Sequence, residues 1–201
     1  MSMRRALAHT VASTRSDWCT PQVVLDRVLQ LYPGVFLDPA TNIHSDVNAA
    51  HNFVRPGDSL PEEYLVAEMS RYRKWEMMDG LEISWADYIA AHGNAEVDSL
   101  VYVNPPYGRR ENKVWAHKIR EEARAGCHIL ALVPANTETN WFANYWQADA
   151  LCFWGGRLHF KGGEHVADFA SAIIYFGPHV CGFSQIFSHA GAVVTPNEYT
   201  G

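Results

Sequence analysis

Cysteine is scarce in this chain, and no cysteine has the spacing of a metal or redox site. Cys19, Cys127, Cys152 and Cys181 are scattered among 201 residues, and no two of them form a Cys-x-x-Cys pair. Scattered cysteines are typical of free thiols in a reducing compartment, so we expect four buried, unpaired side chains. The ten histidines form no His-Glu-x-x-His cluster, and we therefore expect no bound metal.

Long apolar runs are absent as well. No stretch approaches the roughly 20 residues that a membrane helix needs. His9 and Thr10 interrupt the N-terminal alanines before they reach the length of a signal peptide's apolar core. These absences predict a cytoplasmic protein without a membrane partner.

A surplus of positive charge is also missing. The formal net charge of −6 excludes proteins that hold DNA through bulk charge, but it allows a nucleic-acid enzyme with one local basic face. Hydrophobic residues make up 48% of the chain and charged residues 19%, which is typical of a globular protein. A chain of 201 residues is expected to form one domain that buries roughly 70% of its unfolded surface.

The order of predicted helices and strands indicates an α/β fold. Thr20-Pro21 favours a helix start and Pro33-Gly34 a helix stop. Helical spacing predicts further helices over 59–78, 84–93, 112–125 and 139–146. Short apolar runs predict strands over 35–37, 100–103, 129–133, 150–153, 157–160 and 170–176. Because the last strands lack intervening helices, we expect a mostly parallel sheet with an antiparallel terminal hairpin.

Two predicted strands end in residues suited to chemistry, at the edge where open α/β sheets bind ligands. Asp38-Pro39 follows the first strand, and Asn104-Pro105-Pro106-Tyr107 follows the strand over 100–103. The adjacent prolines fix the loop and leave its carbonyls as acceptors. The Asn104 oxygen and the next carbonyl can accept both hydrogens of an exocyclic amino group, which favours a tetrahedral nitrogen with its lone pair aimed at an electrophile. The alternative is a proline-rich turn without chemistry.

A series of motifs in register extends this pattern. They are Asp17-Trp18-Cys19-Thr20-Pro21, Phe36-Leu37-Asp38-Pro39-Ala40, Asn48-Ala49, Asn104-Pro105-Pro106-Tyr107-Gly108, Leu132-Val133-Pro134-Ala135, Asn140-Trp141-Phe142, Gly156-Arg157-Leu158-His159-Phe160 and Ser171-Ala172-Ile173-Ile174-Tyr175-Phe176-Gly177. In this order they resemble the phage-type DNA N6-adenine methyltransferase family over residues 16 to 177. The resemblance implies a Rossmann-like methyltransferase fold with a seven-stranded sheet, S-adenosylmethionine as cofactor, and methyl transfer to adenine N6. It also suggests phage or prophage DNA modification that protects against restriction.

The same resemblance implies roles for individual residues. The catalytic loop would be Asn104, Pro105, Pro106 and Tyr107, with Tyr107 stacking on an adenine flipped out of the duplex. The cofactor would be bound by Trp18, Thr20, Pro21, Asp38, Pro39, Ala40 and Asn48. In this set, Asp38 would accept a hydrogen bond from the cofactor's ammonium group. The alternatives are an Asp-Pro turn at Asp38, a simple helix cap at Thr20, and a surface polar residue at Asn48.

Basic residues after the catalytic loop are candidates for DNA contact. Arg109, Arg110 and Lys113 could meet phosphates beside a flipped adenine, with Arg157 as a weaker candidate. The alternative is a solvated helix start. We expect residues 1–15 to be a flexible N-terminus, 16–177 the methyltransferase domain, and 178–201 a tail. Residues 55–98 would be a helical insert, which either contacts DNA or only covers one face of the protein.

Two other functions remain open at this stage. The same loop would suit amino methylation of an RNA base or a protein glutamine. A catalytically silent DNA-binding or cofactor-binding relative is the second alternative. The oligomeric state and the target sequence are not predicted.

Overall fold

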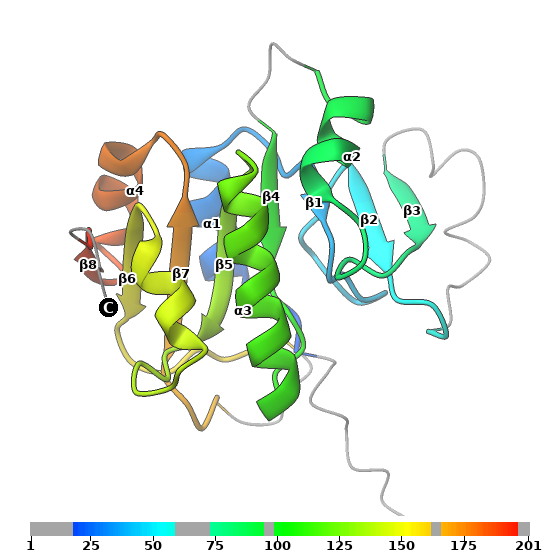
Figure 1. Cartoon of the computed structure of the whole chain (residues 1–201). Helices are drawn as coiled ribbons and strands as arrows, with labels where there is room; N and C mark the ends of the chain where they lie inside the picture. The colour runs from blue at the N-terminus through cyan, green and yellow to red at the C-terminus, as the bar shows by residue number, and fades with distance from the viewer. Residues whose placement is uncertain (1–17, 59–72, 95–98, 162–165, 197–201) are drawn as a thin grey trace, which may run out of the picture.

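The computed structural model describes residues 18–58, 73–94, 99–161 and 166–196, which form an α/β fold (Figure 1). The helices are α1 (Gln22–Leu31), α2 (Trp85–His92), α3 (Arg109–Arg124), the 3₁₀ helix η3 (Phe142–Gln147) and α4 (Val180–Phe187). The strands are β1 (Leu37–Asp38), β2 (His51–Val54), β3 (Lys74–Met77), β4 (Leu100–Val103), β5 (His128–Pro134), β6 (Ala150–Trp154), β7 (Ser171–Phe176) and β8 (Gly191–Val194).

The described strands form one open sheet in the order β3-β2-β1-β4-β5-β7-β6-β8. The first five strands in this order are parallel to one another, and β7, β6 and β8 continue the sheet through antiparallel pairs. The mostly parallel sheet with an antiparallel end is therefore confirmed. The expected count of seven strands is wrong, because β8 adds an eighth beside β6.

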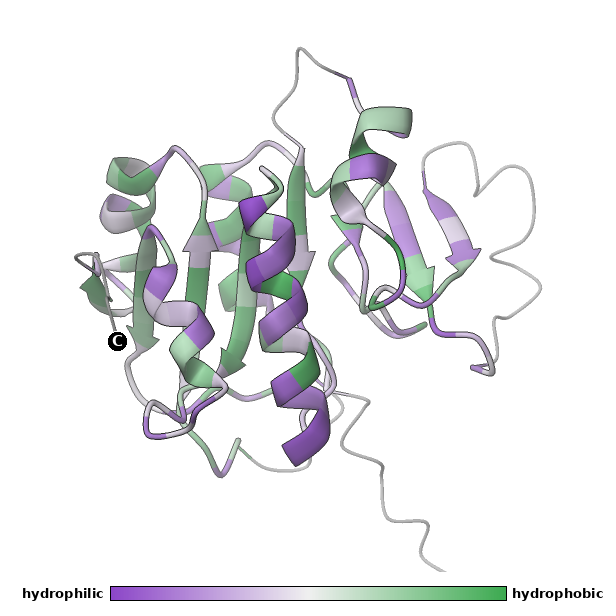
Figure 2. Ribbon diagram, in the orientation of Figure 1, coloured by the Kyte–Doolittle hydropathy of each residue, from purple (hydrophilic) through white to green (hydrophobic). Residues whose placement is uncertain are grey.

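Helices cover both faces of the sheet. Alternate residues of β4 point to opposite faces: Leu100 and Tyr102 pack with α1 and α4, whereas Val101 and Val103 pack with α2, α3 and η3. Every residue of β4 is buried, as expected for a central parallel strand. Figure 2 shows the same layering, with apolar residues along the central strands and hydrophilic residues on the outward side of α3.

Several predicted elements are confirmed. The helix after Pro21 ends at Leu31, and the Ser84 side chain caps α2 by accepting a hydrogen bond from Asp87 N. Gly126, at φ 97°, follows the end of α3 in the left-handed region that favours glycine. α3 begins at Arg109, three residues before the predicted start at 112.

Other predictions need correction. The helix expected to reach residue 78 is a strand over Lys74–Met77, because this segment pairs with β2; its part over 59–72 lies outside the described residues. Residues 157–160 form no strand, since β7 and β8 already occupy both edges of β6. The segment over 139–146 is a 3₁₀ rather than an α-helix.

Beyond residue 177, where a tail was predicted, the chain forms α4 and β8. α4 packs on the same sheet face as α1 through Phe183 and Phe187. The N-terminal segment over 1–15 lies outside the described residues. None of the four cysteines forms a disulfide, as expected, but Cys181 in α4 is exposed rather than buried.

Candidate functional site

The loops that follow β1 and β4 line one cavity. β1 and β4 are neighbouring parallel strands, and the strand order changes direction between them, which is where open α/β sheets bind ligands. The cavity has a volume of about 330 Å³, within the range of small-molecule sites. The predicted site residues that line it are Trp18, Pro39, Ala40, Asn104, Pro105, Pro106, Tyr107 and Arg110.

Hydrogen bonds fix the side chain of Asn104 at the cavity wall. Its Nδ2 donates to the carbonyl oxygen of Trp18 at 2.8 Å. Its Oδ1 accepts from the Tyr107 hydroxyl at 2.6 Å, and this hydroxyl also lies 3.2 Å from the Leu132 carbonyl oxygen. An amide oxygen has two lone pairs, so Oδ1 can accept one further hydrogen bond from a group in the cavity.

Tyr107 is held by a cluster of rings as well as by its hydroxyl. Trp18, Phe160 and Phe169 meet its ring edge to face at centroid distances of 6.1, 5.9 and 5.4 Å. Burial raises the pKa of the Tyr107 phenol above its ordinary value, so the hydroxyl remains a donor to Asn104 at every physiological pH. Phe169 lies outside the sequence motifs and was not predicted near this site.

Asp38 directly precedes the lining residues Pro39 and Ala40 but does not itself line the cavity, and it is 3% exposed. Its carboxylate accepts a hydrogen bond from Ala40 N at 3.1 Å, and the Thr41 and Ser45 side chains also bond to it. Burial raises its pKa from 3.8 to about 7, and these hydrogen bonds oppose the shift. Within the described part of the chain, Asp38 forms no ion pair. A buried carboxylate of this kind would be stabilised by a positively charged ligand group.

A third segment, the turn Asp79–Leu81 after β3, closes the cavity against the loop after β1. A Cβ atom added to Gly80 would lie 2.0 Å from the Pro39 carbonyl oxygen, so only glycine permits this approach. The Trp85 indole nitrogen donates to Gly80 O at 2.8 Å and ties the turn to α2. This segment was not predicted at the site, although the run Asp79-Gly80-Leu81 contains a glycine, the residue type that allows a close backbone contact.

The cavity lining lacks four of the predicted cofactor residues: Thr20, Pro21, Asp38 and Asn48. Thr20 is buried and its hydroxyl lies 3.0 Å from the Tyr102 hydroxyl, while the N-cap position of α1 belongs to Pro21, without a side-chain cap. The helix-cap alternative for Thr20 is therefore wrong. Asn48 is exposed, with φ at 57°. Thr20 and Pro21 are thus buried residues outside the cavity lining, and Asn48 is a surface residue.

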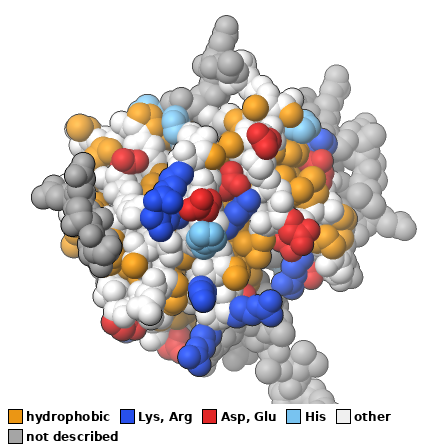
Figure 3. Space-filling view, in the orientation of Figure 1, with side chains coloured by type: hydrophobic (Ala, Val, Ile, Leu, Met, Phe, Trp, Pro, Cys, Tyr) orange, Lys and Arg blue, Asp and Glu red, His pale blue; other side chains and the backbone are white. Residues whose placement is uncertain are grey.

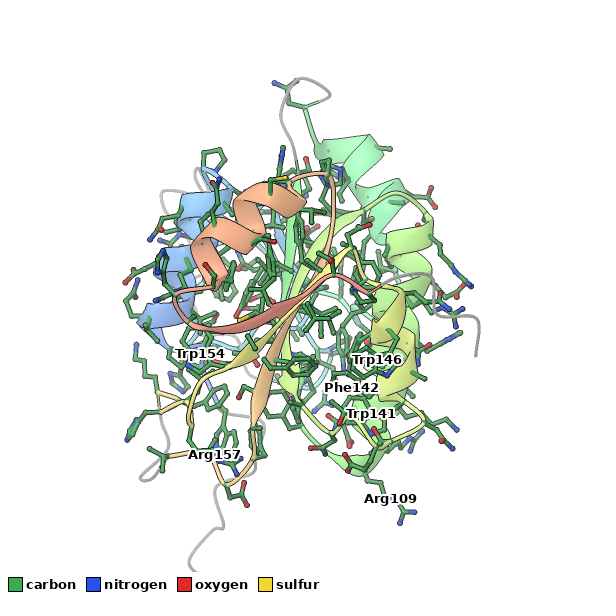
Figure 4. All side chains as sticks on the ribbon, turned by 90° about the vertical axis from the view of Figure 1, so that its left-hand side faces the viewer. Arg109, Trp141, Phe142, Trp146, Trp154 and Arg157 are labelled. Carbon is green, nitrogen blue, oxygen red and sulfur yellow. The ribbon has the colours of Figure 1, made fainter. Side chains whose placement is uncertain are left out.

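The predicted DNA-contacting residues divide into two groups. Arg109, Arg110 and Lys113 are exposed in the first turns of α3, and Arg110 reaches the cavity. Arg157 lies in the segment after β6 and does not line the cavity; Figure 4 shows it apart from Arg109 at the lower end of the view.

The described residues contain no group of three or more side chains that could hold a metal ion. No helix among them is both long enough and apolar enough to cross a membrane. Comparisons with models of known protein families and with curated protein sequences find no match for this chain.

Proposed function

We propose that this protein is an S-adenosylmethionine-dependent methyltransferase that modifies the N6 amino group of adenine in DNA. The observation that carries the proposal is the meeting of the Asn104–Tyr107 loop and the loop after Asp38 at one cavity. One loop carries acceptors for an amino group, and the other lies over a buried carboxylate suited to a cation.

The residues around the cavity fit this cofactor in their chemistry. Bound S-adenosylmethionine would supply an electrophilic methyl group and a positively charged ammonium group. Asp38 would hold the ammonium group, and Pro39, Ala40 and Trp18 would supply apolar and aromatic contacts. Binding a cation would also restore the ionised form of Asp38 that burial disfavours.

Asn104 would orient the target amino group. Its Oδ1 and the Pro105 carbonyl oxygen would accept the two amino hydrogens, which favours a tetrahedral nitrogen whose lone pair points at the methyl group. Tyr107 is a positioning residue here, because its hydroxyl holds Oδ1 in place. Asn104 takes up no proton at neutral pH, so the proton released from nitrogen leaves to water.

A labelled methyl group tests the proposal and its alternatives together. The full chain is incubated with S-adenosylmethionine carrying a tritiated methyl group and, separately, with methyl-free DNA, RNA and a protein extract. We expect label in DNA, its loss with Asn104→Ala, and its retention with Asn112→Ala, a matched asparagine in α3 that lines no cavity.

The other outcomes assign the alternatives. Label in RNA or in protein, with none in DNA, would contradict the DNA proposal and favour amino methylation of that polymer. Label in no polymer, together with no heat of S-adenosylmethionine binding in a calorimeter, would favour a catalytically silent relative.

A further inference from the structure

A second hollow adjoins the cavity. It has a volume of about 890 Å³ and lies between α3 and the segment 139–144 that leads into η3. Leu81 and Val114 line both spaces, so the two are adjacent. We call this hollow the α3–η3 groove.

One wall of the groove is basic. Arg109, Lys113 and His117 follow one another at four-residue spacing on α3 and are exposed. This spacing places them on one helix face, about 6 Å apart along the axis. Neither Arg109 nor Lys113 forms an ion pair within the described residues. Figure 3 shows Lys, Arg and His side chains over α3, with Asp and Glu side chains among them.

The other charged residues of this wall, Lys118 and Glu121, form ion pairs within the protein. Lys118 binds the buried carboxylate of Glu122 at 2.6 Å. Glu121, at the far end of the groove, pairs with Arg124 at 3.2 Å. Among the described residues that line the groove, Glu121 is the only carboxylate, and Arg124 neutralises it.

The opposite wall carries an aromatic side chain, Trp141, which is half-buried. Its ring lies 5.8 Å from that of Phe142 and meets Tyr145 edge to face at 6.1 Å. Asn144 Nδ2 donates to the Trp141 carbonyl oxygen at 2.9 Å. Figure 4 shows Trp141 and Phe142 close together on the same side as Arg109. The half-buried indole thus packs against Phe142 and Tyr145 where it lines the groove.

We propose that the α3–η3 groove binds the DNA strand next to the target base, with phosphates on Arg109 and Lys113 and an unpaired base stacked on Trp141. The combination of a backbone-tracking row of cations with an aromatic platform is typical of single-strand binding. The proposal rests on the proposed function, and it adds a preference for single-stranded or locally opened DNA.

Binding of oligonucleotides tests the groove without any methyl transfer. The probe is a fluorescein-labelled 20-nucleotide single strand containing adenines, compared with its duplex by fluorescence anisotropy over a range of salt concentrations. The variants are Trp141→Ala, Trp141→Phe and Lys113→Gln. Lys74→Gln is the control, because Lys74 is an exposed cation at the start of β3 that lines neither the cavity nor the groove.

We expect tighter binding of the single strand than of the duplex. Trp141→Ala should weaken it about tenfold or more, and Trp141→Phe should retain most of the affinity. Lys113→Gln should lower the slope of log affinity against log salt by about one. Lys74→Gln should leave both quantities unchanged. Thermal melting of each variant checks that the fold is retained.

Two failures can be told apart. If the wild type methylates DNA while Trp141→Ala and Lys113→Gln bind the single strand as the wild type does, the groove proposal is overturned and the proposed function stands. If the wild type neither binds nor methylates DNA, both fall together. A duplex preferred over the single strand would overturn the stacking of an unpaired base.

Discussion

The Tyr107 hydroxyl donates to Asn104 Oδ1 at 2.6 Å, while Asn104 Nδ2 donates to the Trp18 carbonyl oxygen at 2.8 Å. Both ends of the amide are therefore held by the protein. An amide fixed in this way presents its oxygen to the cavity in a single orientation. Removing the Tyr107 hydroxyl therefore tests whether the orientation of the Asn104 amide matters, without changing Asn104 itself.

Tyr107→Phe keeps the ring and removes only the hydroxyl. We expect methyl transfer to fall about 100-fold, since a small misplacement of a reacting group can cost this much. S-adenosylmethionine binding, measured by calorimetry, should change little. Tyr32→Phe is the control, because it also removes a buried hydroxyl, bonded to Tyr175 at 2.9 Å, but lies away from the cavity. Equal losses in both variants would mean that Tyr107 acts only through stability.

Gly80→Ala tests the contact between the loops after β1 and β3. The new Cβ would lie 2.0 Å from Pro39 O and must push the loops apart. We expect a loss of about 1–3 kcal/mol in the free energy of unfolding, together with weaker S-adenosylmethionine binding. Gly34→Ala, with no atom within 4 Å of the added Cβ, should affect neither quantity. Unchanged cofactor affinity in Gly80→Ala would show that this wall is not part of the cofactor site.

The pKa of Asp38 predicts a pH dependence of stability. Burial raises this pKa from 3.8 to about 7, so between these pH values the native state holds a proton that the unfolded state has lost. Stability therefore falls as pH rises from about 4 to 7, by an amount on the order of a few kcal/mol. Asp38→Asn should remove this fall, and urea unfolding of both proteins at pH 5 and pH 8 measures it.

Cofactor affinity should depend on pH in the opposite direction from stability, because the cofactor needs the ionised form of Asp38. An ammonium group needs the ionised carboxylate, so cofactor affinity in the wild type should decline below pH 7 and be low in Asp38→Asn at every pH. The variant would then be more stable than the wild type at pH 8 but a weaker binder. An Asp38→Asn variant that binds S-adenosylmethionine as tightly as the wild type would contradict the assignment.

Glu122 joins α3 to the start of α2. Its Oε2 accepts from the backbone nitrogens of Trp85 and Ala86 at 2.9 and 3.1 Å, and its Oε1 binds Lys118. Glu122→Gln removes the charge that both partners require, and we expect a loss of about 3–5 kcal/mol in the free energy of unfolding. Glu121→Gln, which breaks an exposed pair with Arg124, should cost less than about 1 kcal/mol. Chemical denaturation of both variants compares the two.

The sequence predicted the central strands because they are rich in apolar residues: β4 is buried throughout, and β5 is buried apart from His128 at its start. The edge strands escaped prediction for the opposite reason. β3 carries Lys74 and Glu76 and has no fully buried residue, so its strand form depends on pairing with β2. Residues 157–160 have strand-like composition, but the position beside β6 is taken by β8, which no local pattern could indicate.

The candidate site was predictable where it depends on strand ends and not where it depends on packing. The loops after β1 and β4 follow buried strands, and parallel pairing brings them together. The closeness of Gly80 to Pro39 and the platform of Trp141 depend instead on how separate segments pack. Pro39 and Trp141 lie within the sequence motifs and Gly80 does not, but in no case could the sequence indicate what these residues contact.

The most direct measurement is nucleoside mass spectrometry of methyl-free DNA after incubation with the full chain and S-adenosylmethionine. The proposed orientation of an adenine amino group by Asn104 predicts N6-methyladenine, produced by the wild type and absent with Asn104→Ala. Methylation of cytosine alone, or N6-methyladenine formed equally well by Asn104→Ala, would contradict the proposed function.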